Sequence, residues 1–97
     1  MSARFARGER VHVRLAYPSG HIRTPWFIRG KNGVVERICG EFGNPETLAY
    51  GGNGKPTQPL YRVRFDQTEV WPAYTGADSD TIDIEIFQHW LEPAPEA

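Results

Sequence analysis

The chain has almost no cysteine and no long apolar run. Cys39 is the only cysteine among 97 residues, which excludes an internal disulfide and a metal site built from this chain's own thiolates. We expect Cys39 to be a buried structural thiol. No hydrophobic run approaches the roughly 20 residues that span a bilayer, and the first residues lack the apolar stretch of a signal peptide. We therefore expect a cytoplasmic protein that does not enter a membrane.

Histidine is also scarce and scattered. The three histidines, His12, His21 and His89, have no His-x-His or His-Glu-x-x-His spacing, so we expect no histidine metal site on this chain. The glycine-rich stretch at residues 51–54 lacks the Gly-Lys-Ser/Thr of a phosphate-binding loop. Nothing in the sequence indicates that the chain runs a reaction on its own.

Charge of each sign is concentrated in one half of the chain. Residues 1–37 carry eight basic and two acidic side chains, a net charge of +6, and residues 38–97 carry three basic and ten acidic ones, a net charge of −7. Such asymmetry favours a face that meets an acidic partner. The alternative is an ordinary solvated surface on which the two signs mix after folding.

Alternation of apolar and polar residues predicts an all-β fold. A period of two is typical of half-buried strands, and turn-forming residues separate the alternating segments. We predict a small β barrel of about five strands with long loops, in one domain over residues 1–97. The predicted strands cover residues 8–15, 34–38 with a bulge, 60–65, 68–71, 81–86 and the end of the chain near 92–93. Residues 40–59 are predicted to be one long loop.

The segment from Gly20 to Gly30 holds an unusual set of functional side chains for a loop. A loop on a small β scaffold is a common place for binding residues. Pro25 is suited to the first position of a short helical turn, with Gly30 closing that turn. The candidate residues in this segment are His21, Arg23, Trp26, Phe27 and Arg29.

Arg23 is the strongest of these candidates. Its planar guanidinium stays charged and suits bidentate binding of a carboxylate, a phosphate or an oxidised sulfur acid, and His21 could orient such a group. The alternatives are an exposed loop arginine and a hydrogen-bonded loop histidine. Trp26 and Phe27 fit either the core or an exposed partner surface beside Arg23.

Several motifs in one order closely resemble the C-terminal domain of the nitrile hydratase β subunit. The loop carries Gly20-His21-Ile22-Arg23-x-Pro25 followed by Arg29-Gly30. The other matching segments are 4–14, 33–35, Tyr61-Arg62-Val63-Arg64-Phe65, Glu69-Val70-Trp71 and 83–94, with Trp90 where the family usually has Tyr. The likeness covers nearly the whole chain.

The resemblance implies an SH3-like barrel and a role for the loop. Arg23 would match the arginine that reaches into the partner α subunit and hydrogen-bonds oxidised cysteines there. Those cysteines hold non-corrin cobalt or non-haem iron, so this chain would bind no metal itself. His21 would match a histidine that contacts an α-subunit arginine, with Arg29, Trp26 and Phe27 as further partner contacts. The implied reaction hydrates a nitrile to an amide.

The chain departs from the family in lacking the helical N-terminal half of the β subunit. We therefore expect a split β subunit that works with an α subunit and a separate N-terminal-type β subunit. Three-subunit relatives suggest a small-molecule substrate such as a nitrile, with the nucleoside nitrile toyocamycin as one candidate. The alternatives are a subunit of a thiocyanate hydrolase-like enzyme, a nucleic-acid-binding barrel and a structural adaptor without a site. The net charge of −1 and the pI of 6.3 weigh against nucleic acid.

Overall fold

The computed structural model describes residues 3–18, 22–49, 51–55 and 57–95. The elements, in chain order, are β1 (Arg10–Val13), η1 (Trp26–Ile28), β2 (Asn32–Phe42), α1 (Pro45–Ala49), β3 (Gln58–Asp66), α2 (Gln67–Val70), β4 (Thr81–Phe87), η2 (Gln88–Trp90) and β5 (Leu91–Pro93). None of the helices in these ranges is long and apolar enough to cross a membrane.

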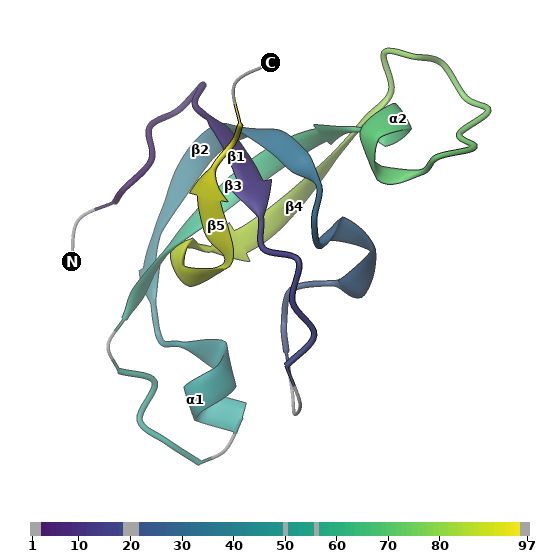
Figure 1. Ribbon diagram of the computed structural model, residues 1–97. Helices are drawn as coiled ribbons and strands as arrows, with labels where there is room; N and C mark the ends of the chain where they lie inside the picture. Colours follow the sequence, from purple (N-terminus) through teal and green to yellow (C-terminus); the bar gives the residue numbers. More distant parts are fainter. Residues whose placement is uncertain (1–2, 19–21, 50, 56, 96–97) are drawn as a thin grey trace.

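The five strands form one antiparallel sheet with the order β4-β3-β2-β1-β5. The sheet is strongly bent, and β1 and β5 are seen in front of β3 and β4 (Figure 1). The prediction of an all-β chain with about five strands is confirmed. Within the described residues β4 and β5 do not pair with each other, so the predicted barrel is an open sheet rather than a closed one.

The alternating pattern places the core on one face of the sheet. Val11 and Val13 of β1, and Tyr61, Val63 and Phe65 of β3, are fully buried. Full burial of such side chains stabilises a fold by about 1.5–3 kcal/mol each. The other buried core members are Phe5, Ile28, Val35, Val70, Ile86, Trp90 and Leu91. The alternation therefore determines which face of each strand points inward.

Strand β2 is longer and more irregular than its neighbours. Its pairing with β3 shifts register between Val35 and Arg37 and again between Ile38 and Gly40. Gly40 has a φ of 130°, which only glycine adopts without strain. The predicted bulge is confirmed, but the strand continues to Phe42 because these bulges let it bend and stay paired.

Two segments differ from their predicted conformation. Residues 68–71 form no strand; they lie in or next to α2, where the Trp71 N–H donates to the Gln67 carbonyl at 3.0 Å and Val70 is buried. The predicted 40–59 loop contains α1 and the ends of β2 and β3. Asn44 starts α1, because its side-chain oxygen accepts from the N–H groups of Glu46 and Thr47.

Candidate functional site

All the predicted site residues belong to the segment that connects β1 to β2. The base of this segment is closed by two backbone hydrogen bonds, from Val13 N–H to the Lys31 carbonyl at 2.9 Å and from Gly30 N–H to the Val13 carbonyl at 2.8 Å. Gly30 has a φ of 80°, which the turn into β2 requires. His21 lies outside the described residues, so its role stays a prediction. Pro25 precedes η1 rather than starting it.

Arg23 lies against the outer strand β4. Its Nη1 donates to the Glu85 carbonyl oxygen at 2.5 Å, and its Nη2 lies 3.9 Å from the Glu85 carboxylate. The guanidinium carbon is 5.6 Å from the centre of the Phe87 ring. The side chain is nevertheless 41% exposed. One edge of the guanidinium is therefore anchored on its own chain, and donors remain accessible to a partner.

The surface around Arg23 is an open hollow of about 500 Å³ with balanced charge. Arg62 of β3 holds Glu85 of β4 at 3.1 Å, and Arg64 holds Asp83 at 2.9 Å. These residues are direct cross-strand partners in the sheet. The hydrogen bond from Arg64 lowers the pKa of Asp83 against the opposing effect of its burial. The Asp83 carboxylate beside Arg23 thus stays ionised near neutral pH.

Arg29 has its contacts within its own chain. Its guanidinium donates to the Thr24 carbonyl from Nη2 at 2.7 Å and from Nε at 3.2 Å, and to the Ala16 carbonyl at 3.1 Å. The same group lies over the rings of Trp90 and Tyr17, at 5.0 and 5.3 Å. A direct partner contact by Arg29 stays a prediction, whereas its internal role is evident from these bonds.

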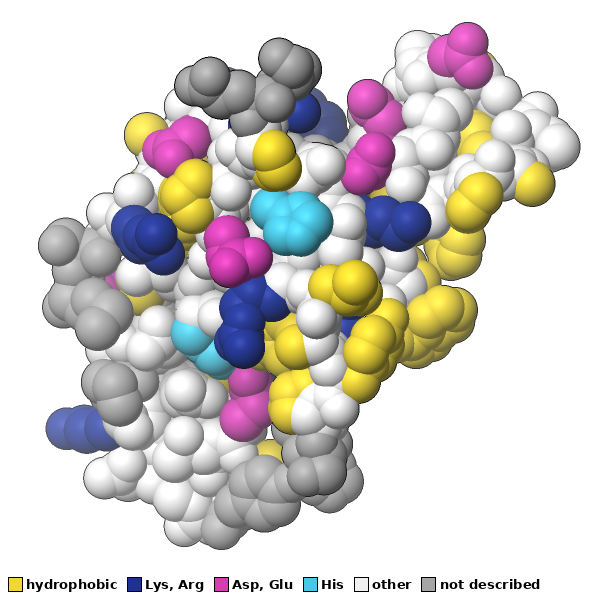
Figure 2. Space-filling view, in the orientation of Figure 1, with side chains coloured by type: hydrophobic (Ala, Val, Ile, Leu, Met, Phe, Trp, Pro, Cys, Tyr) yellow, Lys and Arg dark blue, Asp and Glu magenta, His cyan; other side chains and the backbone are white. Residues whose placement is uncertain are grey.

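Trp26 and Phe27 help to form an apolar face beside the loop. Trp26 is 68% exposed, and Phe27 packs edge-on against Trp26 and stacks on Trp71 at 5.3 Å. Leu15 and Tyr17 border the same groove of about 430 Å³. Figure 2 shows hydrophobic side chains gathered on the side of the molecule that carries α2. We call the surface formed by the aromatic residues Tyr17, Trp26, Phe27 and Trp71 together with Leu15 the aromatic face.

Sequence reasoning missed a half-buried carboxylate next to Trp90. Glu46 of α1 accepts a hydrogen bond through one oxygen from Trp90 Nε1 at 2.9 Å and pairs with His89 Nε2 at 2.8 Å. Burial raises the pKa of Glu46, but the bonds from His89 and Trp90 outweigh it, and the pKa is lowered. Glu46 lies more than 40 residues from its partners, and no local motif signals such a pair.

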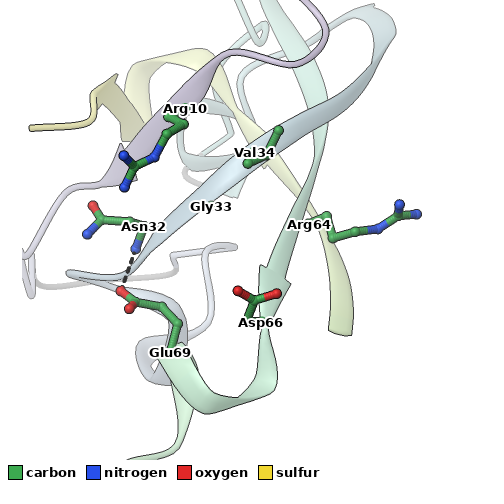
Figure 3. Close-up of a pocket in the computed structure, with 7 residues that line it drawn as sticks. All are labelled: Arg10, Asn32, Gly33, Val34, Arg64, Asp66 and Glu69. Atoms are coloured by element: carbon green, nitrogen blue, oxygen red, sulfur yellow. Dashed lines mark hydrogen bonds between the residues drawn. The ribbon is translucent and has the colours of Figure 1, made fainter. Parts of the chain in front are cut away.

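A second hollow lies across β1, β2 and β3, away from the predicted site (Figure 3). Glu69 accepts a hydrogen bond from the Asn32 backbone N–H at 2.9 Å there. The Arg64 side chain points away from Glu69 (Figure 3) and pairs with Asp83. The remaining lining residues include Arg10 and Asp66, whose charges oppose each other. We assign no function to this hollow.

The described residues contain no group of three or more His, Cys, Asp or Glu side chains arranged to hold a metal ion. Cys39 is half-buried, so the expectation of a buried thiol is wrong. It lies on β2 at the second register shift, between Ile38 and Gly40, and Ile38 is exposed.

The fold and the site define a small all-β module that offers an arginine from the β1–β2 loop and an apolar face from that loop and Trp71. The family model "Nitrile hydratase beta subunit, C-terminal" matches residues 1–93. The chain therefore belongs to the family formed by the C-terminal domains of nitrile hydratase β subunits.

Individual relatives agree with this family. The chain is 36% identical over 94 residues to the nitrile hydratase subunit β of Pseudomonas chlororaphis, covering 96% of this chain and 42% of that protein. It is 38% identical over 93 residues to a low-molecular-weight cobalt-containing nitrile hydratase subunit β of Rhodococcus rhodochrous, covering 95% and 40%. The chain thus spans about two fifths of the length of these relatives.

The thiocyanate hydrolase of Thiobacillus thioparus is similar over more of its own length. Its subunit α is 30% identical to this chain over 93 residues, covering 95% of this chain and 73% of that protein. A solved structure of the recombinant apo-enzyme superposes with a TM-score of 0.90 at 29% identity, covering 96% and 78%. The matched region therefore makes up most of the thiocyanate hydrolase subunit α.

Proposed function

We propose that this chain is a non-metal-binding subunit of a heteromeric nitrile hydratase. The observation that carries the proposal is the family match over residues 1–93 together with the exposed guanidinium of Arg23. The matched region makes up about two fifths of the nitrile hydratase β subunits, and we propose that a separate N-terminal-type β chain supplies the rest. The catalytic metal would lie on an α subunit.

Arg23 would cap that metal centre. A guanidinium anchored at one edge by the Glu85 carbonyl keeps its remaining donors in a fixed plane, which suits the two oxygens of an oxidised cysteine on the partner. Such bonds orient metal ligands and tune their basicity. His21, two residues earlier, would support the same contact.

The metal itself would be non-corrin cobalt or non-haem iron. The name of the Rhodococcus rhodochrous relative includes cobalt, and the described residues of this chain offer no ligand group for either metal. When bound on the α subunit, the metal supplies Lewis acidity for adding water across the C≡N bond. The contribution of this chain would be to fix hydrogen-bond donors and to exclude water around that centre.

The aromatic face would cover the partner. Trp26 is exposed and Phe27 packs between it and Trp71, and large aromatic side chains dominate binding energy at protein interfaces. An exposed apolar surface of this kind is unfavourable in a free monomer. It therefore supports permanent assembly into a heteromer.

Two substrate classes compete. We propose a small nitrile, with a nucleoside nitrile such as toyocamycin as one class member. The alternative is thiocyanate, which the name of the Thiobacillus thioparus relative favours because the chain covers 73% of that protein but only about two fifths of the nitrile hydratase β subunits. Both substrates present a C≡N bond to the same kind of centre.

A nucleic-acid-binding barrel has less support. Of the arginines that could form a basic surface, Arg62 and Arg64 are paired with acids and Arg29 is bound to backbone carbonyls. Binding to phosphates needs a row of free cations, and these side chains do not provide one.

The experiment is co-expression of this chain with the products of its neighbouring genes, which we expect to include an α-type and an N-terminal β-type subunit. We expect a single complex that contains this chain and cobalt or iron, and that converts a nitrile to its amide. A panel of simple nitriles, toyocamycin and thiocyanate identifies the substrate class. Failure of this chain to co-purify, or full turnover in a complex that lacks it, would contradict the proposal.

A further inference from the structure

The Arg29 guanidinium is held by two rings and two carbonyl groups of its own chain. It lies over two aromatic rings, Trp90 at 5.0 Å and Tyr17 at 5.3 Å. Its N–H groups are bonded to the carbonyls of Thr24 and Ala16. Arginine stacks and forms planar forks in a way that lysine cannot. The two halves of the loop are therefore tied together through one side chain.

Trp90 connects Arg29 to a distant part of the chain. Trp90 is 2% exposed, and its Nε1 donates to Glu46 of α1 at 2.9 Å. The same Glu46 oxygen pairs with His89 at 2.8 Å. A buried indole N–H without a partner is costly, so the position of Glu46 and the orientation of Trp90 depend on each other.

We infer that Arg29, Trp90 and Glu46 form a positioning network that links the Arg23 loop to the segment between β2 and β3. This inference rests on the proposed role of Arg23 for its functional consequence. The network reaches the functional residue through Thr24, the neighbour of Arg23, which is 3% exposed and bonded twice by Arg29. The Arg23 side chain reaches Glu85 on β4. Because Thr24 follows Arg23 in the chain, the position of the Thr24 backbone determines whether Arg23 can keep this direction.

The network also gives the long segment between β2 and β3 a role. Glu46 joins α1 to η2 through its bonds with His89 and Trp90. Among the described residues these are the side-chain hydrogen bonds that connect α1 to a segment outside the β2–β3 connection. The backbone of this segment is closed on itself, with Asn44 N–H donating to the Gly54 carbonyl at 2.7 Å. A preformed segment of this kind can act as a brace on Trp90.

The first test is local order in the free chain. In Arg29→Lys the charge stays but the fork is lost, and we expect the backbone NMR order parameter at Thr24 to fall from about 0.85 to below about 0.6. Hydrogen exchange at the Ile28 amide, which donates to the Pro25 carbonyl at 3.2 Å, should rise about tenfold. Exchange at the Val63 amide in the core should not change. Arg37→Lys is the matched control, because Arg37 is an exposed arginine on β2 outside the network.

The second test is coupling between the two loops, since a proposed network needs evidence beyond proximity. Glu46→Ala should raise Ile28 exchange about threefold, and Glu46→Gln should restore most of the protection because an amide oxygen still accepts from Trp90. In the double variant Arg29→Lys with Glu46→Ala, exchange should match that of Arg29→Lys alone. Independent multiplication of the two effects, or an equal rise at Val63, would overturn the network.

The functional arm uses the assembled enzyme. Arg29→Lys should lower kcat while KM stays within about twofold, because the network positions Arg23 without touching the substrate. If Arg23→Ala abolishes turnover but Arg29→Lys loosens Thr24 with kcat unchanged, the positioning role is wrong and the proposed function stands. If Arg23→Ala is harmless, the proposed function fails, and the network is then judged by Thr24 order alone.

Discussion

Arg23 and Arg29 lie six residues apart in one loop and have opposite environments. Arg29 uses its donors on Thr24 and Ala16 and lies over the rings of Tyr17 and Trp90, so its truncation would disorder the loop. Among the described residues Arg23 has one firm bond, to the Glu85 carbonyl, and its ion pair with the exposed Glu85 carboxylate contributes little. Arg29 therefore shapes the loop, and Arg23 is available to a partner.

Ionisation of Glu46 should make the stability of the folded chain depend on pH. Its pKa is lowered in the folded chain, so its stabilising contribution is present above the ordinary carboxyl value of 4.5 and is lost as the pH falls through the lower folded value. Urea unfolding between about pH 7 and pH 3 should show a larger loss of stability in the wild type than in Glu46→Gln, which keeps only the loss from other carboxylates such as Asp83. An identical pH dependence in the two proteins would contradict the assignment.

The strand elements could be predicted because a period of two survives in β1, β3 and β4. The α2 segment could not, because Thr68 to Trp71 is too short for either period to be visible, and its helix depends on Val70 reaching the core. The open sheet was also beyond sequence reasoning, since alternation determines which face is buried but not whether the edges meet.

Gly33 lies where β2 passes too close to β3 for a side chain to fit. A Cβ at this position would lie 2.8 Å from both the Arg64 carbonyl oxygen and the Phe65 ring, which belong to the neighbouring strand. Gly33→Ala should lower the free energy of unfolding by about 1–3 kcal/mol, the usual range for overpacking. Gly43→Ala is the control, because its nearest atom is the movable end of Leu48 at 3.1 Å. Equal denaturation midpoints for the two variants would show that β2 can move away from β3.

Half of the candidate site followed from residue types, and half depended on tertiary contacts. Arg23 and Trp26 could be chosen as candidates from residue type, because a loop is a common place for binding residues, and their roles stay predictions. Trp71 was missed because its segment was assigned to a strand, and the aromatic face forms only when α2 places it on Phe27. The internal role of Arg29 depends on Tyr17 and Trp90, which no spacing links to it.

At the scale of the whole molecule, the aromatic face should control assembly. Trp26→Ala should leave the fold intact, because the side chain is largely exposed. It should weaken binding to the partner subunits about 30-fold, which corresponds to roughly 2 kcal/mol for a central aromatic anchor. Ile38→Ala, on the exposed part of β2, should bind as tightly as the wild type. Calorimetry with the purified partners measures both, and equal affinities would place the interface elsewhere.

The most direct test of the central claim is the turnover of the assembled complex carrying Arg23→Ala. Loss of a charged hydrogen bond to a buried anion costs at least about 2 kcal/mol, so we predict a fall in kcat of about 30-fold or more, with the metal content and the ratio of subunits unchanged. Arg37→Ala, prepared in the same way, should retain full activity. Near-wild-type turnover in the Arg23→Ala complex would contradict the account.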